Sequence, residues 1–277
     1  LASNGDFVVR FWGVRGSIAC PGPETVRYGG NTSCLEVRCG DRLLILDAGS
    51  GLRRLGMSLL GNGPINADIL FTHTHFDHIT GLPFFAPLFA PENSFGLWSG
   101  HLLPEQDIET VLCEMMMAPL FPVPMEVMAA AKTFNDFNCG ETLSFGDAIR
   151  VRTGPLNHPN RATGYRIEFG GRSICYITDT EHVGDALDEN ILALIEGTDY
   201  FIYDSTYTDE EYPNHIGWGH STWQRGVALA EAAGVGTYVA FHHDPSHDDD
   251  FMDDIARRID AARPGSIVAR EGMTLTP

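Results

Sequence analysis

The chain has 277 residues, of which 43% are hydrophobic, and this is enough apolar material for one large core. It carries a formal net charge of −19, and its longest basic runs are the pairs Arg53-Arg54 and Arg257-Arg258. Because so acidic a surface repels long polyanions, extended nucleic acid is expected to be a poor partner. No apolar run approaches the roughly twenty residues that a membrane span needs, and no linker divides the chain. We therefore expect a single domain over residues 1–277 with no membrane partner.

The six cysteines are scattered along the chain and form no CxxC pair. Small buried thiols in a reducing cytoplasm are the expectation for such a pattern, which makes the cytoplasm the expected location. Residues 1–6 lack a basic region followed by an apolar core, so no signal peptide is expected.

The first elements in chain order are apolar runs separated by glycine-bearing turns. Residues 7–12 and the hairpin 35–47 are predicted to form strands, and a helix is predicted over 52–60. Asp47 stands at the end of the hairpin, where it opens the turn that leads into this helix.

The next run, 69–71, is predicted to be a buried strand, and three imidazoles and a carboxylate follow it within a few residues. Residues two apart at a strand end point the same way, so His73 and His75 can bind one metal ion. The turn that follows offers Asp77 and His78 to a second ion. Neutral imidazole suits zinc and other borderline first-row metals, and a carboxylate adds an oxygen ligand. The sequence therefore predicts two metal ions side by side.

The run THTHFDH at 72–78 resembles the HxHxDH signature of the metallo-β-lactamase-fold hydrolases. The resemblance implies an α/β protein with the four-layer αββα sandwich of that family. The segment around Asp47 looks like the LDAG turn of the same family. By that resemblance, its carboxylate would support the metal-binding loop from behind.

Aromatic residues are frequent after this motif, in Phe84-Phe85, Phe89 and 95–98. They form either a substrate wall or a dimer surface, or they pack into the core. Residues 104–131 begin with apolar residues at helical spacing, which prolines then interrupt. The stretch around 83–135 is thus predicted to be a lid or the oligomer contact of a homodimer.

Two further ligand candidates follow in the second half of the chain. His158 lies in a proline-rich loop, and Asp179 comes directly after the apolar run 173–177, where a carboxylate can bridge two cations. The segments HPNRATGYRIEF and RSICYITDT are similar to those of the RNase Z-like and phosphodiesterase branch of the family. There they provide the third histidine and the bridging aspartate, so the resemblance implies these roles for His158 and Asp179.

The strand predicted over 200–204 leads to a loop that contains His220. Ser221 and Gln224 fit a capping box that opens a helix over 223–233. A phosphate is favoured at such a helix start, where His220 can hold a phosphoryl oxygen or protonate a leaving group. GHST looks like the histidine-bearing motif of RNase Z relatives, which implies a catalytic His220. The alternative is a histidine that only belongs to the capping loop.

The last buried strand is predicted over 238–241 and ends in His242-His243. One of these histidines should complete the ligands of the second metal. The resemblance favours His242, and His243 is the fallback or a substrate contact. The acidic run 248–250 is predicted to cap the next helix rather than to bind a metal.

Together these candidates predict a binuclear centre: His73, His75 and His158 on one ion, Asp77, His78 and His242 on the other, and Asp179 between them. Two divalent ions about 3.5–4 Å apart, most simply Zn²⁺, with Mn²⁺ or Fe²⁺ as alternatives, convert a bridging water into hydroxide at neutral pH. Asp77 can orient this hydroxide, and His220 can serve the leaving oxygen. The predicted function is hydrolysis of a small phosphodiester such as a cyclic nucleotide.

Several other functions share part of this pattern. RNase Z-type tRNA 3′-processing is the first alternative, against which stand the acidity of the chain and the lack of a basic arm. A lactonase, a glyoxalase II-like thioesterase or a β-lactamase would not explain GHST. A flavodiiron oxidoreductase would need a carboxylate in place of His75. The alternative without catalysis is a nucleotide-binding sensor with an idle site.

Overall fold

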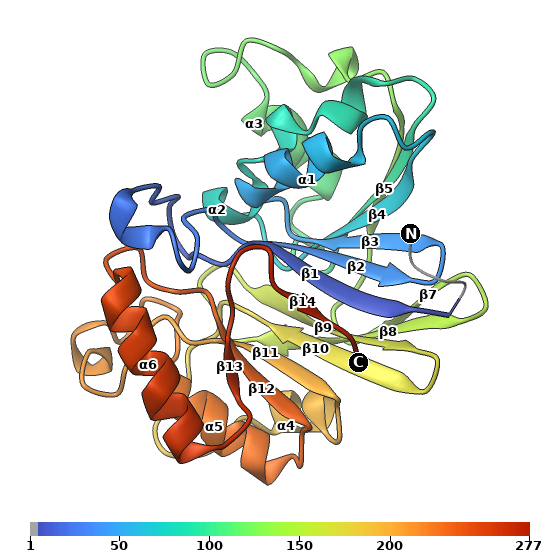
Figure 1. Ribbon diagram of the computed structural model, residues 1–277. Helices are drawn as coiled ribbons and strands as arrows, with labels where there is room; N and C mark the ends of the chain where they lie inside the picture. Colours follow the sequence, from blue (N-terminus) through green and yellow to red (C-terminus); the bar gives the residue numbers. More distant parts are fainter. Residues whose placement is uncertain (1–4) are drawn as a thin grey trace.

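The computed structural model describes residues 5–277 as two seven-stranded sheets that pack face to face, with helices on both outer sides (Figure 1). The strand order is β14-β1-β2-β3-β4-β5-β6 in the first sheet and β13-β12-β11-β10-β9-β8-β7 in the second. This arrangement confirms the predicted four-layer αββα sandwich. Residues 1–4, where the expectation about a signal peptide begins, lie outside the described residues.

The strands of the first sheet are β1 Phe7–Gly13, β2 Cys34–Cys39, β3 Arg42–Leu46, β4 Asn66–Phe71, β5 Ser94–Ser99, β6 Ala131–Asp136 and β14 Thr274–Leu275. Those of the second sheet are β7 Thr142–Phe145, β8 Ile149–Leu156, β9 Ala162–Phe169, β10 Arg172–Ile177, β11 Tyr200–Asp204, β12 Thr237–Phe241 and β13 Ile267–Val268. The α-helices are α1 Gly51–Leu59, α2 Phe76–Ile79, α3 Ile108–Met115, α4 Glu189–Ile195, α5 Trp223–Ala232 and α6 Asp249–Ala262.

Alternation of side chains along the central strands divides the core into three layers. In β3, Leu44 and Leu46 face the other sheet, whereas Leu43 and Ile45 belong to the cluster that α1 and α3 cover. In β10, Tyr176 faces the first sheet and Cys175 belongs to the cluster under α4, α5 and α6. Such strands are buried on both faces, which is why they appear in the sequence as nearly continuous apolar runs.

Each sheet has an antiparallel half and a parallel half. Strands β3 to β6 are parallel in the first sheet, as are β10 to β13 in the second. The carboxyl ends of parallel strands lie at one edge of a sheet, where α/β proteins place their ligand sites. The segments that follow β4, β10, β11 and β12 contain the predicted site residues except His158, which lies in the loop between β8 and β9.

The stretch around 83–135 contributes to the first sheet and its cover. It forms β5, α3 and β6, and the side chains of Phe85, Phe95 and Leu112 are buried in the core. Phe84 and Phe89 remain exposed, as does Leu120 in the proline-rich loop. Most of the aromatic residues after the metal motif are therefore packed in the core, and a lid or oligomer role for the exposed part stays a prediction. Among the residues from 5 onward, no helix is both long and apolar enough to cross a membrane.

Candidate metal centre

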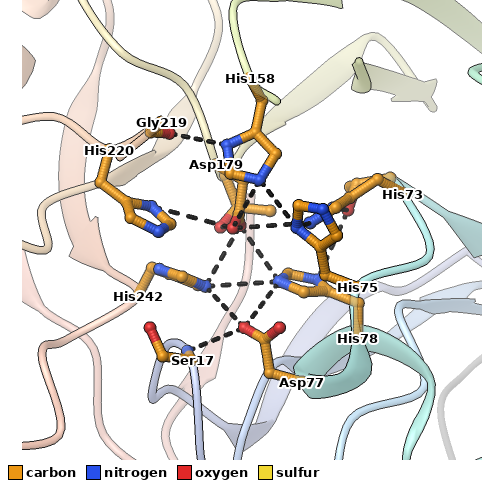
Figure 2. A network of polar contacts seen from close by, with 12 residues as sticks. Ser17, His73, His75, Asp77, His78, His158, Asp179, Gly219, His220 and His242 are labelled. Atoms are coloured by element: carbon orange, nitrogen blue, oxygen red, sulfur yellow. Dashed lines mark hydrogen bonds and ion pairs between the residues drawn. The ribbon is translucent and has the colours of Figure 1, made fainter. Parts of the chain in front are cut away.

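The predicted ligands come together between the two sheets, around the carboxylate of Asp179 (Figure 2). His73 to His78 follow β4 and enter α2, Asp179 follows β10, and His242 follows β12. His158 lies in the loop between β8 and β9. Four segments from distant parts of the sequence thus meet at one point.

The first group consists of His73, His75 and His158. The Nδ1 atom of His75 lies 2.9 Å from Nε2 of His73 and 3.0 Å from Nε2 of His158. The remaining ring nitrogens of two of them have other partners: Nδ1 of His158 donates to the carbonyl oxygen of Gly219 at 2.8 Å, and Nδ1 of His73 lies 3.1 Å from the Thr72 hydroxyl. Their Nε2 atoms therefore carry lone pairs and face the centre of the group.

The second group consists of Asp77, His78 and His242. Nε2 of His78 and Nε2 of His242 lie 3.3 Å apart, and Oδ2 of Asp77 is 3.2 Å from the first and 3.4 Å from the second. The backbone N–H of Ser17 donates to the same Asp77 oxygen at 2.8 Å and orients it. This group has the mixed nitrogen and oxygen donors that the sequence predicts.

Asp179 connects the two groups through its two oxygens. Oδ1 lies 3.7 Å from Nε2 of His73 and 3.8 Å from Nε2 of His158, and Oδ2 lies 3.1 Å from Nε2 of His78 and 3.2 Å from Nε2 of His242. Figure 2 shows the carboxylate in the middle of the ring of histidines. One carboxylate oxygen per group is an arrangement that suits a ligand bridging two cations.

The donor set fits a cation at its centre. Nδ1 of His78 lies 2.8 Å from Asp47 and Nδ1 of His242 lies 3.1 Å from the Thr206 hydroxyl, so the Nε2 atoms of both rings face the carboxylates of Asp77 and Asp179. Buried carboxylates and ring nitrogens that face one another need a cation between them, either a proton or a metal ion. The cluster therefore fits a metal site.

The pKa shifts express the same electrostatics. Burial lowers the pKa of His73 well below its usual value, which keeps the imidazole in the neutral form that binds metals. Burial also opposes a charged His78, but the carboxylates of Asp179, Asp77 and Asp47 outweigh it and raise the pKa of His78 well above its usual value. The carboxylates create a negative potential that a positive charge at this place stabilises.

Asp47 holds the metal-binding loop in place without belonging to either ligand group, as the family resemblance implied. Its fully buried carboxylate accepts the Thr72 backbone N–H at 2.8 Å and the Tyr176 hydroxyl at 2.9 Å, and it orients His78. A carboxylate that holds the N–H of a ligating histidine fixes the tautomer of that histidine.

We expect Asp47→Asn to lower the free energy of unfolding by about 3 kcal/mol, because the amide group turns a donor towards donors in a buried site. The backbone of Asp47 has a φ of 59°, which asparagine adopts readily, so this variant tests the polar contacts without adding backbone strain. Denaturant unfolding of the metal-free protein measures the change. The matched control is Asp147→Asn at an exposed position, and equal stability of the two variants would contradict the supporting role.

His220 lies beside the centre together with a carboxylate that the sequence reasoning missed. Its Nδ1 is 3.0 Å from Oδ2 of Asp204, the last residue of β11, and 3.8 Å from Oδ1 of Asp179. Burial lowers the pKa of His220, but Asp204 outweighs burial and raises it to about 9. Asp204 is itself oriented by the N–H groups of Thr180 and Thr206, both at 3.1 Å. The signal in the sequence was a carboxylate directly after an apolar strand, as at Asp179.

The predicted capping box before α5 is wrong. Thr222 is the N-cap, and its hydroxyl accepts the backbone N–H of Arg225. The Ser221 hydroxyl instead accepts the Tyr203 hydroxyl at 2.8 Å and lies 2.9 Å from Nδ1 of His182. Ser221 is fully buried, and these side-chain partners occupy its oxygen. His220 remains two residues ahead of the cap.

Of the two histidines after β12, only His242 faces the centre. It has a φ of 62°, and Gly16 lies so close that an added Cβ would come within 2.4 Å of its ring. His243 points elsewhere: its Nε2 lies 2.9 Å from the carbonyl oxygen of Ala269, and its ring packs on Tyr28. The structure therefore gives no support to His243 as the fallback ligand.

Several cavities lie outside the ligand cluster, and two of them differ in their relation to it. One of about 680 Å³ lies over β1 and β2 and contains none of the converging side chains. Another of about 150 Å³ adjoins the centre and is lined by Asn157, Thr180 and Glu181, the neighbours of His158 and Asp179. The candidate site adjoins the second cavity. The first contains no candidate ligand, and of its charged residues Glu36 and Arg38 pair with each other.

Residues 42–243 match the family model of the Beta-lactamase superfamily domain, and the chain belongs to that superfamily. It is a hydrolase of the metallo-β-lactamase fold. The chain is 26% identical over 257 residues to ribonuclease Z of Bradyrhizobium sp. (strain ORS 278), covering 75% of this chain and 82% of that protein.

Two solved structures show the same fold over nearly the whole chain. A diphosphatase from the PhnP family has a TM-score of 0.71 at 18% identity and covers 97% of both chains. Zn²⁺-bound PqqB from Methylobacterium extorquens has a TM-score of 0.70 at 19% identity and covers 97% of this chain and 99% of its own. At these identities the likeness extends to the fold.

Proposed function

We infer that this protein is a binuclear metal-dependent phosphodiesterase. The observation that carries the inference is Asp179, which turns one oxygen towards each of two groups of buried donors. His73, His75 and His158 would hold one cation, and Asp77, His78 and His242 the other. When bound, the two cations would activate a water molecule as the nucleophile and stabilise the charge that develops on the phosphoryl oxygens.

Zinc is the metal that the first group supports best, because three neutral imidazoles are a common zinc donor set. The solved Zn²⁺-bound PqqB is consistent with this choice. Mn²⁺ or Fe²⁺ would also accept the second group, in which a carboxylate joins two imidazoles.

The residues beside the metals support a phosphodiester as the substrate. Asp77 can orient the nucleophile, because its carboxylate faces the second group and is held by the Ser17 N–H. His220 carries a proton that its contact with Asp204 stabilises, and Nδ1 is the atom engaged in that contact. This leaves Nε2 to donate a proton to the departing alkoxide, a requirement of phosphodiester hydrolysis. Ribonuclease Z, the name of a relative, and diphosphatase, the name of a structural neighbour, also denote hydrolases that cleave P–O bonds.

The charge of the chain supports a small substrate. The net charge is −19, and most arginines are neutralised by neighbouring acids, as in the pairs Arg54 with Glu271, Arg172 with Asp199 and Arg258 with Glu210. A long polyanion binds chiefly through clustered unpaired basic groups. We therefore place cyclic nucleotides and dinucleotides ahead of larger substrates. The second candidate is tRNA 3′-processing, which the ribonuclease Z relative favours.

We expect the protein loaded with Zn²⁺ or Mn²⁺ to hydrolyse bis(p-nitrophenyl) phosphate, and chelated protein to be inactive, because the donors alone supply no nucleophile. Release of p-nitrophenolate measures the reaction. A panel of cyclic mononucleotides, dinucleotides and precursor tRNA then separates the two candidates. Hydrolysis of lactones or thioesters with no turnover of any phosphodiester would refute the proposed function, and processing of precursor tRNA at physiological salt would refute the preference for small substrates.

A further inference from the structure

The segment Tyr212–Gly219, here called the strap, delivers two groups to the metal centre. The carbonyl oxygen of Gly219 accepts Nδ1 of His158, and His220 follows directly. Gly219 has a φ of 86°, and an added Cβ would lie 2.4 Å from the His158 ring, so this close approach requires glycine. The strap has one short 3₁₀ turn of its own, Tyr212–Asn214, and exposed side chains at Ile216 and Trp218. Its position over the centre therefore depends on contacts with its surroundings.

The carboxylate of Glu181 makes these contacts. Oε1 accepts the Gly217 N–H at 2.7 Å, and Oε2 accepts the Gly219 N–H at 2.8 Å. The Tyr212 hydroxyl lies 3.2 Å from Oε1 and also donates to the carbonyl oxygen of His182 at 2.8 Å. Both oxygens are engaged, and both ends of the strap are bound. Hydrogen bonds from N–H groups to a carboxylate are among the stronger kind.

The backbone of Glu181 is attached to the ligand loops. Its N–H donates to the carbonyl oxygen of Asn157 at 2.8 Å, and its own carbonyl oxygen accepts the Asn157 side-chain amide at 2.8 Å. Asn157 precedes His158, and Glu181 stands two residues after Asp179. The contacts thus close a ring from His158 through Asn157, Glu181 and Gly219 back to His158.

We propose that Glu181 is a positioning residue that clamps the strap against the metal ligands, so that Gly219 orients His158 and His220 faces the reacting phosphate. The proposal rests on the proposed function for its catalytic part. It assigns a role to the Glu181 carboxylate, which is not a candidate ligand of either metal ion and is not part of the Asp204–His220 pair. Because the ring joins the loop of Asp179 to the strap, the position of this loop also determines that of His220, the proposed proton donor.

The substitutions Glu181→Ala and Glu181→Gln test the clamp. Alanine removes all three contacts, whereas glutamine keeps one acceptor oxygen and turns its amide group towards an N–H, so its effect should be smaller. The matched control is Asp107→Asn, which removes a carboxylate that accepts a backbone N–H at the exposed cap of α3. All variants are measured as full chains, and their thermal midpoints are checked to be equal before the comparison.

Four expected results follow from the proposal. In Glu181→Ala, the amides of Gly217 and Gly219 should exchange with solvent faster, and the affinity for one Zn²⁺ ion should fall about 10- to 100-fold because His158 loses its oriented partner. kcat should fall by about the same factor with little change in KM. The loss should be larger for diphenyl phosphate than for bis(p-nitrophenyl) phosphate, because the more basic leaving group depends more on a correctly placed proton donor.

The outcomes separate this proposal from the proposed function. Unchanged exchange and unchanged Zn²⁺ affinity in Glu181→Ala would overturn the clamp. Faster exchange with wild-type Zn²⁺ affinity and turnover would reduce Glu181 to a loop anchor and would also overturn it. If the unsubstituted protein hydrolysed no phosphodiester, the proposed function would fail, whereas exchange and Zn²⁺ titration would still decide on the clamp.

Discussion

Asp179→Asn should reduce the proposed phosphodiesterase activity more than about 100-fold, the upper end of the range for residues that only support a metal ligand. The asparagine can offer one oxygen to one group of donors, but its amide group then faces the other group. Asparagine adopts the φ of 55° found at this position, so backbone strain does not complicate the comparison. One of the two metal ions should be lost together with the activity.

A measurement without substrate tests the same prediction. Zn²⁺ should raise the thermal midpoint of the unsubstituted protein, since a ligand present at 100 times its Kd stabilises the folded state by about 2.7 kcal/mol. In Asp179→Asn the increase should be much smaller, and elemental analysis should find less metal per chain. The matched control is Asp68→Asn, a buried carboxylate in β4 that pairs with Arg42 and Trp98. Two tightly bound ions in Asp179→Asn would exclude the bridging role.

The local parts of the centre could be predicted from the sequence, because short-range geometry determines them. One strand is followed by His73, His75, Asp77 and His78, and their spacing alone divides them between two neighbouring metal positions. Asp179 and His242 each follow an apolar run, His158 lies in a proline-rich loop, and the family resemblance assigned all three to the set. The structure brings all seven side chains together.

The parts that escaped prediction depend on contacts between distant segments. Asp204 is separated from His220 by a long loop, and only the parallel pairing of β11 with β10 and β12 places it beside Asp179 and His242. Glu181 is an ordinary polar loop residue in the sequence, and its role depends on where the strap returns. The predicted cap of α5 was wrong for a similar reason. The local motif assigns the Ser221 hydroxyl to capping, but buried side chains of other elements contact it instead.

His220→Ala should lower kcat about 100- to 10,000-fold for a substrate with a basic leaving group, the usual contribution of a general acid. The loss should be smaller for bis(p-nitrophenyl) phosphate, because p-nitrophenolate departs without full protonation. Asp204→Asn should show the same dependence on the leaving group, since Asp204 stabilises the proton on His220. Rates for a series of aryl phosphodiesters measure this dependence as a slope against the pKa of the leaving group.

Metal content distinguishes a proton donor from a further ligand at His220. His220 lies close enough to His158 and Asp179 to share a metal ion with them, so the geometry also allows it to be a metal ligand. If His220 serves the leaving oxygen, His220→Ala keeps both ions and its leaving-group slope becomes steeper. If His220 binds a metal, the variant loses an ion and its rate falls equally for all leaving groups. The His220 nitrogen that reaches Asp179 is Nδ1, at 3.8 Å, and Asp204 already contacts this atom at 3.0 Å, so we expect the first result.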